Sequence, residues 1–561
     1  MGVLENDFDK EKNELLSFAC DKFESGEYDT ALGAFVLAYQ KGYEQEWILD
    51  NIYRCYFAAN EEEFRKAYQQ WDVRSIVTYK ECILDFIPYR DSEYYIYDKQ
   101  KMIFRGVLSV HELQNIKQDA VLEDMEFSAV ALVVDWDWRI VQQVLTAAVE
   151  RKTYIICKDL KRCLSFWKIP ELREYLSNIK IFSDFKEYQN YFHENTDQYL
   201  PKIFYGNEDQ KKKFFEIGNE EHQYRLTPEG RNTENVLLTI AIPTYNRGHL
   251  LLKHIKNLLL MPYDAEVEIV VSKNGTQFYQ EEYVQVSEIQ DARINYFDHG
   301  KDLYFINNWH YAVEMSCGKY VLVISDEDQV IIEKLEHYFR LLSRYPDLCM
   351  VRPKSTVMYH HLDKREYGKK GWDAFRIAFL RQSHFPGLIV RRQDFIEADL
   401  LSLERFADNL YYRYYPHEWW CIMLSQRGDC MNEPVILCDD SEPIDHVEEW
   451  ERMGLPTVPE WVTYDTRIGQ FQGMVDLLTS VIKMEDKNLL EQFIELTINK
   501  TTLLFKSTRN SGYKLNNYQK MVEKFVEISI GIIQESLLDS VQKVRLLYKL
   551  NDYSKYLYVD E

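Results

Sequence analysis

The chain has 561 residues, of which 67 are Lys or Arg and 91 are Asp or Glu, so its formal net charge at pH 7 is −24. This length suggests about three to four domains, and the charge argues against nucleic acid as a partner. No apolar run reaches the ~20 residues of a transmembrane helix, and the acidic N-terminus does not resemble a secretory signal. Ten scattered cysteines favour reduced thiols. We therefore expect a cytoplasmic protein, and peripheral contact with the inner face of the membrane stays open.

Residues 1–75 are expected to be helical. The spacing of small and large apolar residues is that of a tetratricopeptide helix pair: Leu15, Phe18, Ala19, Phe23, Gly26, Ala31, Phe35 and Ala38. Trp47 to Trp71 is a candidate for a second pair. Stacked repeats bind protein segments, so a protein partner is one expectation. The alternative is a helical cap packed on the next domain, because two repeats are fewer than the roughly three that stand alone.

Residues 76–230 are expected to form a small α/β domain with a linker. Short apolar runs predict strands at 129–135, 152–157 and 179–183, with helices at 140–149, 172–176 and 185–192. No glycine-rich turn follows these strands, so no phosphate cradle is expected there. A structural or docking role is the default. The polar stretch 208–235 is the expected linker.

The stretch from Val236 to Asp328 has the pattern of a parallel α/β sheet. Buried strands are predicted at 236–242, 267–272 and 320–324, and a helix with an apolar face lies between the first two. Polar segments follow the three strands: Pro243–Arg247, Lys273–Thr276 and Asp326–Asp328. Because ligands bind beyond the carboxyl ends of such strands, these segments are expected to converge on one site.

Residues 451–561 are predicted to form a helical C-terminal domain. Apolar residues recur at helical spacing in four segments: Ile468–Ile482, Leu489–Leu504, Tyr518–Leu537 and Val541–Tyr556. Basic residues of the last segment, Lys543, Arg545 and Lys549, would suit a membrane surface. The acidic residues among them favour simple packing instead.

The central part of the chain resembles the family 2 glycosyltransferases, which use nucleotide sugars and have the GT-A fold. The matching residues are Ile242–Arg247, Val271–Thr276, Asn308, Ala312–Glu314, Gly318–Val321 and Ser325–Asp328. The resemblance covers residues 236–450 and implies an α/β, Rossmann-like GT-A core at 231–450. The helical N-terminal region, the small α/β domain and the helical C-terminal domain would flank this core.

The resemblance implies that the loop after the first strand binds the nucleotide sugar. This loop consists of Pro243, Thr244, Tyr245, Asn246 and Arg247. Its backbone N–H groups and the following helix N-terminus favour negative charge. Asn274 and Asp326 would also contact the nucleotide, with Asp326 near the ribose. The plainer alternative is that Thr244 or Asn246 only caps the helix.

The resemblance further implies a Mn²⁺ or Mg²⁺ cofactor, because carboxylates bind hard cations that can neutralise a leaving diphosphate. Asp328 is the expected metal ligand. His446 is a candidate for a further ligand or a diphosphate contact, although a lone surface histidine is more often neither. Asp-x-Asp by itself is a weak motif, and its place after a buried strand gives it weight here.

Lys273 departs from the family. Many members have an aspartate at this position that accepts the N3–H of uracil, whereas lysine has only donors. The usual inference of a UDP donor is therefore weakened. Cytosine, whose N3 is an acceptor, is one alternative, and the donor nucleotide stays open.

Glu418 lies about where the family places its catalytic base, among the aromatic residues of Tyr412–Trp420. In an inverting transfer, such a carboxylate takes the proton of the acceptor hydroxyl. Burial beside Trp419 and Trp420 is expected to raise its pKa. The alternative is a structural role at a helix start, with Asp408 as the second candidate base. Arg391 and Arg392 are candidate phosphate contacts.

The sequence therefore predicts an inverting, metal-dependent glycosyltransferase of the hexosyl type, acting on a hydroxyl of a glycan or protein acceptor. The alternative is a non-catalytic scaffold with a degenerate GT-A domain that binds glycans or proteins. Lys273 supports this alternative, and the intact pair Asp326 and Asp328 speaks against it. Nucleotidyl transfer is disfavoured, because Pro243–Arg247 is not a glycine-rich basic phosphate loop.

Overall fold

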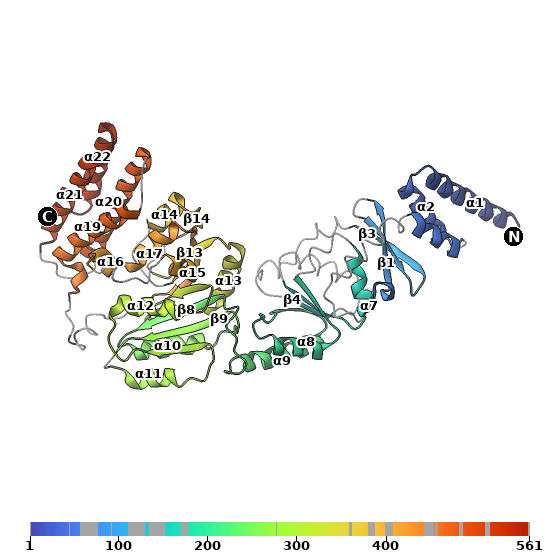
Figure 1. The fold of residues 1–561 in the computed structure, drawn as a ribbon, viewed down its shortest axis with the longest axis horizontal. Helices are drawn as coiled ribbons and strands as arrows, with labels where there is room; N and C mark the ends of the chain where they lie inside the picture. The colour runs from blue at the N-terminus through green and yellow to red at the C-terminus, as the bar shows by residue number, and fades with distance from the viewer. Residues whose placement is uncertain are drawn as a thin grey trace. The chain divides into compact units, whose positions relative to one another are not determined.

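The computed structural model describes most of the chain. The described residues are 2–43, 45–55, 77–90, 93–109, 130–133, 152–169, 178–275, 278–357, 362–379, 387–398, 408–441, 451, 454, 458–481, 486–510 and 517–558. The chain divides into two compact units (Figure 1). One comprises Met1–Asn195 with Tyr199–Glu221, and the other comprises Thr196–Gln198 with His222–Glu561.

The first unit begins with helices α1 (Gly2–Glu24) and α2 (Tyr28–Gln40). The turn between them contains Gly26, whose φ of 79° favours glycine. Strands β1 (Leu84–Arg90), β2 (Glu93–Asp98) and β3 (Ile103–Ser109) then form an antiparallel sheet that the sequence did not predict. The helices and this sheet share one apolar cluster: Ala19, Ala31, Phe35, Ile87, Tyr97 and Phe104 belong to it. This is the packing expected of a helical cap, and the tetratricopeptide resemblance stays a prediction.

A parallel sheet follows in the first unit, as expected for a small α/β domain. Its strands are β4 (Val130–Val133), β5 (Thr153–Ile156), β6 (Ile179–Phe182) and β7 (Ile203–Tyr205), in the order β6-β5-β4-β7. Three of them coincide with predicted strands, and so does helix α8 (Phe185–Glu194) with the predicted helix. The helices expected at 140–149 and 172–176 lie outside the described residues.

The stretch expected to be a linker is largely helical. Helix α9 covers Glu208–Arg225. Phe214 and Ile217, which are three residues apart, are buried on one side of it, and Phe214 belongs to the cluster that covers β5 and β6. The prediction of a linker relied on the many charged residues of this segment and overlooked these two apolar positions.

The second unit contains a large mixed sheet. Its described strands are β8 (Leu238–Thr244), β9 (Val267–Lys273), β10 (Ile294–Asp298), β11 (Tyr320–Val323), β12 (Gln329–Val330), β13 (Leu348–Ser355), β14 (Glu366–Gly368), β15 (Leu388–Arg391) and β16 (Asp429–Asp439). Their order is β10-β9-β8-β11-β15-β13-β16-β12, and β14 pairs with β16. The pairs among β10, β9, β8 and β11 are parallel, as predicted. Beyond β11, outside the stretch for which a parallel sheet was predicted, β15 is antiparallel to both β11 and β13.

Helices cover both faces of the parallel half. Figure 1 shows α10 (Gly248–Leu258) and α11 (Gln280–Ser287) on one face and α12 (Tyr304–Glu314) on the other. Every residue of β8, β9 and β11 is buried, which is the pattern of strands covered on both sides. The carboxyl ends of these strands therefore form one edge of a rigid platform.

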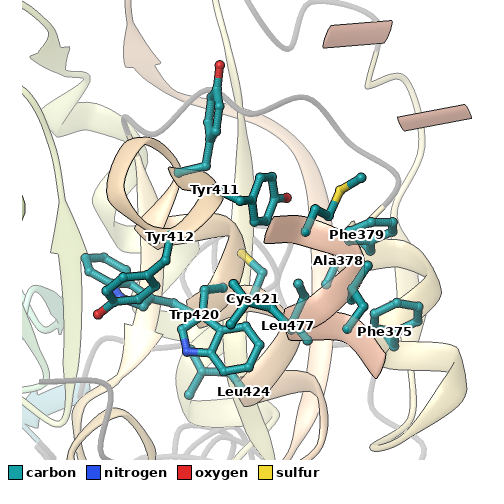
Figure 2. Packing of buried hydrophobic residues seen from close by; sticks show 14 of the residues in the cluster. Phe375, Ala378, Phe379, Tyr411, Tyr412, Trp420, Cys421, Leu424 and Leu477 are labelled. Carbon is teal, nitrogen blue, oxygen red and sulfur yellow. The ribbon is translucent and has the colours of Figure 1, made fainter. Parts of the chain in front are cut away.

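The four helices predicted near the C-terminus are confirmed. They are α19 (Tyr464–Val481), α20 (Lys487–Asn510), α21 (Tyr518–Glu535) and α22 (Ser540–Lys555). Their apolar faces join the same cluster as α14 (Trp372–Phe379) and α17 (Pro416–Ser425). Figure 2 shows Leu477 of α19 close to Ala378 of α14 and Cys421 of α17. The C-terminal helices and the sheet region thus share one hydrophobic core.

None of the helices in the described part of the chain is both long enough and apolar enough to span a membrane.

Candidate active site

Thr244, at the end of β8, lies at the centre of a buried hydrogen-bond chain. Its Oγ1 is 2.7 Å from Oδ2 of Asp326 and 2.7 Å from the hydroxyl of Tyr283 on α11. The backbone N–H of Arg247 donates to the same Tyr283 hydroxyl over 3.1 Å. Because β8 and β11 are parallel neighbours, their ends bring Thr244 and Asp326 together. The structure thus joins three of the residues that the sequence predicts for one site.

Arg247 links this chain to the acidic loop after β11. Its Nη1 lies 2.5 Å from Oε2 of Glu327 and 3.5 Å from Oδ1 of Asp326. Arg247 is also the residue immediately before α10, and it has no side-chain cap bond. The alternative role of Thr244 or Asn246 as the helix cap is therefore wrong. An anion at this helix start would meet the Arg247 guanidinium group and the positive end of the helix dipole.

Asn246 and Tyr245 occupy the rest of the loop. Asn246 is buried with a left-handed φ of 58°, and its Oδ1 accepts a 3.4 Å hydrogen bond from the N–H of Phe278. Tyr245 is 40% exposed. Burial and the nearby Asp302 carboxylate raise the pKa of Tyr245. This loop therefore presents an accessible aromatic ring above a buried polar floor.

Asn274 uses its side chain to shape the neighbouring loop. Its Nδ2 donates to Oδ1 of Asp302 over 2.8 Å, and its Oδ1 accepts from the N–H of Leu303 over 2.6 Å. The following Gly275 lies so close to Lys301 that a Cβ would sit 2.3 Å from its carbonyl carbon. Asn274 thus fixes the backbone of residues 301–303, and a direct contact with a nucleotide stays a prediction.

Lys273 pairs with Asp298 at the ends of the adjacent strands β9 and β10. Its Nζ lies 2.7 Å from Oδ2 of Asp298 and 5.1 Å from the centre of the Tyr283 ring. The Lys273 side chain is 9% exposed, whereas that of Asp298 is 44% exposed. Burial opposes the charge of Asp298, but the hydrogen bonds from Lys273 and from the N–H of Gly300 lower its pKa. The ends of β9 and β10 therefore present an ionised carboxylate beside a lysine.

Asp326 and Asp328 are buried side chains, only 3% and 5% exposed. Burial, opposed by the charge of Arg247, raises the pKa of Asp326 to about 6. Burial, together with repulsion from Glu327, Asp440 and Asp326, raises the pKa of Asp328 to about 8. Among the described residues, no donor reaches Oδ2 of Asp328. A buried carboxylate oxygen without a donor suits a divalent cation.

The described residues hold no cluster of three or more His, Cys, Asp or Glu side chains that would bind a metal ion by themselves. Asp440, which follows β16, is near enough to Asp328 to raise its pKa, and the sequence reasoning missed it. It stands where an apolar strand, Val435–Cys438, runs into acidic residues. This is the same signal that identified Asp326 and Asp328. The candidate ligand His446 lies outside the described residues.

Glu418 lies in a different environment from the one predicted. Its Oε1 accepts a 2.7 Å hydrogen bond from Nζ of Lys500, and its Oε2 accepts a 3.3 Å bond from the Tyr411 hydroxyl. Burial alone would raise the pKa of Glu418, but the charges of Lys500, His417 and Arg352 outweigh it and lower the pKa. The expected upward shift is therefore wrong. The other candidate base, Asp408, lies exposed just before α16 (Leu410–Tyr414).

The arginines at the end of β15 lie at the far edge of the sheet. In the antiparallel pair of β11 and β15, Arg391 faces Tyr320, the first residue of β11, whereas Leu388 faces Val323. Asp326 follows the opposite end of β11. Nη1 of Arg391 donates to the carbonyl of Pro346, and Nη2 of Arg392 donates to that of Glu314. The expectation that they contact phosphate is therefore wrong, since both lie at the end of β11 away from Asp326.

Comparison with known proteins adds to this picture. Residues 239–391 match the family model described as glycosyl transferase family 2. Among solved structures, residues 1–349 of S. aureus TarS align with a TM-score of 0.39 and 12% identity, over 57% of this chain and 90% of that one. Full TarS aligns with a TM-score of 0.36 and 12% identity, over 57% and 55% of the two chains.

A third structure, the mannosyltransferase PcManGT from Pyrobaculum calidifontis in complex with GDP-Man and Mn²⁺, aligns with a TM-score of 0.31 and 12% identity, over 61% of this chain and 92% of that one. No curated protein matches the sequence. The family match spans β8, the acidic loop after β11 and all of β15. It therefore supports a glycosyltransferase domain, of the family 2 type that uses nucleotide sugars, at residues 239–391.

Proposed function

We propose that the protein is an inverting, metal-dependent glycosyltransferase that transfers a hexosyl group from a nucleotide sugar to a hydroxyl of a glycan or protein acceptor. The observation that carries this proposal is the convergence at the ends of β8 and β11. There Thr244, Arg247 and Asp326 form one hydrogen-bonded set beside the unsatisfied buried oxygen of Asp328. The match of residues 239–391 to family 2 supports the same reaction class.

In this proposal the chain's own groups hold the donor. Asp326, oriented by Thr244, accepts hydroxyl hydrogen bonds from the ribose. The start of α10 and the Arg247 side chain attract the diphosphate. Asp328 would hold Mn²⁺ or Mg²⁺, and the cation would stabilise the charge of the leaving nucleoside diphosphate. Tyr245 offers its exposed ring to the donor.

Glu418 is retained as the candidate base on the strength of the family resemblance. The Lys500 ammonium keeps its carboxylate ionised, as a base requires. Glu418 is 1% exposed, however, and Tyr411 donates to its second oxygen. An acceptor hydroxyl would reach this carboxylate only after a rearrangement that exposes Glu418. Asp408 remains the exposed alternative.

The direct test is binding followed by turnover. Thermal unfolding of the full chain is measured with UDP, GDP, dTDP, CDP and CMP, each with and without Mn²⁺. A ligand that binds only the folded state raises the melting temperature. We expect one nucleotide to do so more strongly with Mn²⁺, and Asp328→Asn to remove the Mn²⁺ effect. The matching nucleotide sugar should then be turned over.

Two outcomes would count against the proposal. A lack of stabilisation by any nucleotide would contradict the donor site. Binding of a nucleotide sugar without hydrolysis or transfer, tested with both glycan and protein acceptors, would favour the non-catalytic scaffold.

A further inference from the structure

The register of the sheet places a second carboxylate opposite Asp328. Strands β12 and β16 are antiparallel, with Gln329 facing Asp439 and Val330 facing Cys438. Asp328 directly precedes β12 and Asp440 directly follows β16, so the same register continued by one step would place them opposite each other. Directly opposite residues in such a pair have Cβ atoms about 4.5–5.5 Å apart. Because side chains alternate between the two faces, Asp439 would lie on the face opposite to that of Asp440.

Two ionised carboxylates that face each other repel, and a proton or a cation bound between them removes the repulsion. Asp328 is buried, and no donor within the described part of the chain reaches its Oδ2. A divalent cation would satisfy this oxygen and would allow both carboxylates to be ionised.

Asp440 is held in a fixed orientation by β13 and the residues after it. Ser355 donates from Oγ to Oδ2 of Asp440 over 2.8 Å, and the N–H of Val357 donates to Oδ1 over 2.6 Å. A carboxylate oxygen that accepts one hydrogen bond can also bind a cation. Hydrogen bonds of this kind typically orient the carboxylates that bind metal ions.

We propose that Asp440 is a second protein ligand of the divalent cation and binds it from the side opposite Asp328. This inference rests on the proposed function. Two carboxylates leave the remaining positions of Mg²⁺ or Mn²⁺ to water and to the oxygens of the donor diphosphate. The donor would then complete the site.

The experiment measures Mn²⁺ binding to the full chain by electron paramagnetic resonance, in which the signal of free Mn²⁺ falls as the ion binds. The variants are Asp440→Asn, Asp328→Asn and the control Asp439→Asn, whose carboxylate accepts from the N–H of Ser441 instead. We expect Asp440→Asn to weaken Mn²⁺ binding by about tenfold or more. Asp439→Asn should leave the Mn²⁺ affinity unchanged.

Thermal unfolding in EDTA shows whether each variant is folded. If Asp440→Asn does not fold, Ser355→Ala replaces it, since loss of the orienting hydroxyl should also weaken Mn²⁺ binding. Wild-type affinity in whichever of these two variants is folded, with loss of binding in Asp328→Asn, would overturn the role of Asp440 and leave the proposed function intact. A wild-type chain that binds neither Mn²⁺ nor any nucleotide would overturn both.

Discussion

Lys500 of α20 donates a 2.7 Å hydrogen bond to Glu418 in the first turn of α17. The two side chains are only 2% and 1% exposed. This buried pair therefore links a C-terminal helix to the sheet region. A buried pair is worth little in net stability, but the loss of one partner leaves the other charge uncompensated.

We predict that Lys500→Met lowers the free energy of unfolding of the second unit by about 3–5 kcal/mol, the usual cost of breaking a buried ion pair. Replacing both partners, in Glu418→Gln with Lys500→Met, should recover part of that loss because neither charge of the pair is left without its partner, while the buried Arg352 near Glu418 keeps its charge. Urea unfolding followed by tryptophan fluorescence gives both values.

The same variants test the catalytic role of Glu418. If it is the base, the stable double variant has no transferase activity. If the double variant turns over donor at the wild-type rate, Glu418 is structural and Asp408 becomes the residue to substitute.

Thr244→Val should weaken nucleotide binding. The substitution removes the hydroxyl that bonds Asp326 and Tyr283, at a cost of about 1–3 kcal/mol for the unsatisfied buried groups. Thr239→Val is a matched control on the same strand, because its Oγ1 donates to buried Glu268 over 2.6 Å at the other end of β8. Calorimetric titration with the nucleotide identified above should show weaker binding for Thr244→Val alone. Equal affinities would mean that Thr244 does not orient the donor contact.

The pair of Lys273 and Asp298 should influence the choice of nucleobase. It presents an N–H donor and a carboxylate acceptor side by side, whereas uracil and guanine each present a carbonyl beside a ring N–H. Asp298→Ala is expected to weaken binding of the preferred nucleoside diphosphate by about tenfold to a hundredfold. This is the range for the loss of a hydrogen bond to a charged group. The ranking of UDP, GDP and CDP should also change. Lys301→Ala, in the same loop, is the control, and an unchanged ranking in Asp298→Ala would place the base elsewhere.

The free energy of unfolding should decrease as the pH is lowered below about 6.5, because of His254. Burial lowers the pKa of this histidine from 6.5 to about 3, so it stays neutral in the folded state. The unfolded chain takes up a proton as the pH drops below 6.5 and the folded chain does not, so each proton favours unfolding. This protonation lowers the free energy of unfolding by about 2 kcal/mol at pH 5 and has no effect above pH 7.

The variant His254→Gln should therefore show a smaller loss of unfolding free energy between pH 7 and pH 5. His249→Gln, on the exposed side of the same helix, is the control. If both variants lose as much stability as the wild type, the titration of His254 does not control the acid side of the stability curve.

The meeting of the ends of β8 and β11 could be predicted because its information is local. The run from Val236 to Ile242 is apolar enough to be a strand by itself, and the polar residues after it must then lie at a strand end. The same reasoning correctly positioned Asp326, which the structure brings within 2.7 Å of Thr244. Neighbouring parallel strands made these two ends meet.

The surroundings of Glu418 depend on contacts between distant residues. Nothing near Glu418 in the sequence reveals Lys500, which is 82 residues away and reverses the pKa shift that the two tryptophans suggested. The direction of β15 was equally hidden, since Leu388–Arg391 would have the same composition in a parallel strand. Because β15 is antiparallel to β11, Arg391 lies at the end of the sheet away from Asp326.

The core shared by α14, α17 and α19–α22 limits where the chain can be shortened. A chain that ends at residue 450 would lose Phe471, Met474 and Leu477 from this core, and Phe471 and Met474 lie beside Tyr411. It would also leave the Glu418 carboxylate without its partner Lys500. Such a fragment should collect in inclusion bodies, while a fragment from residue 222 through 558 should stay monodisperse and bind nucleotide.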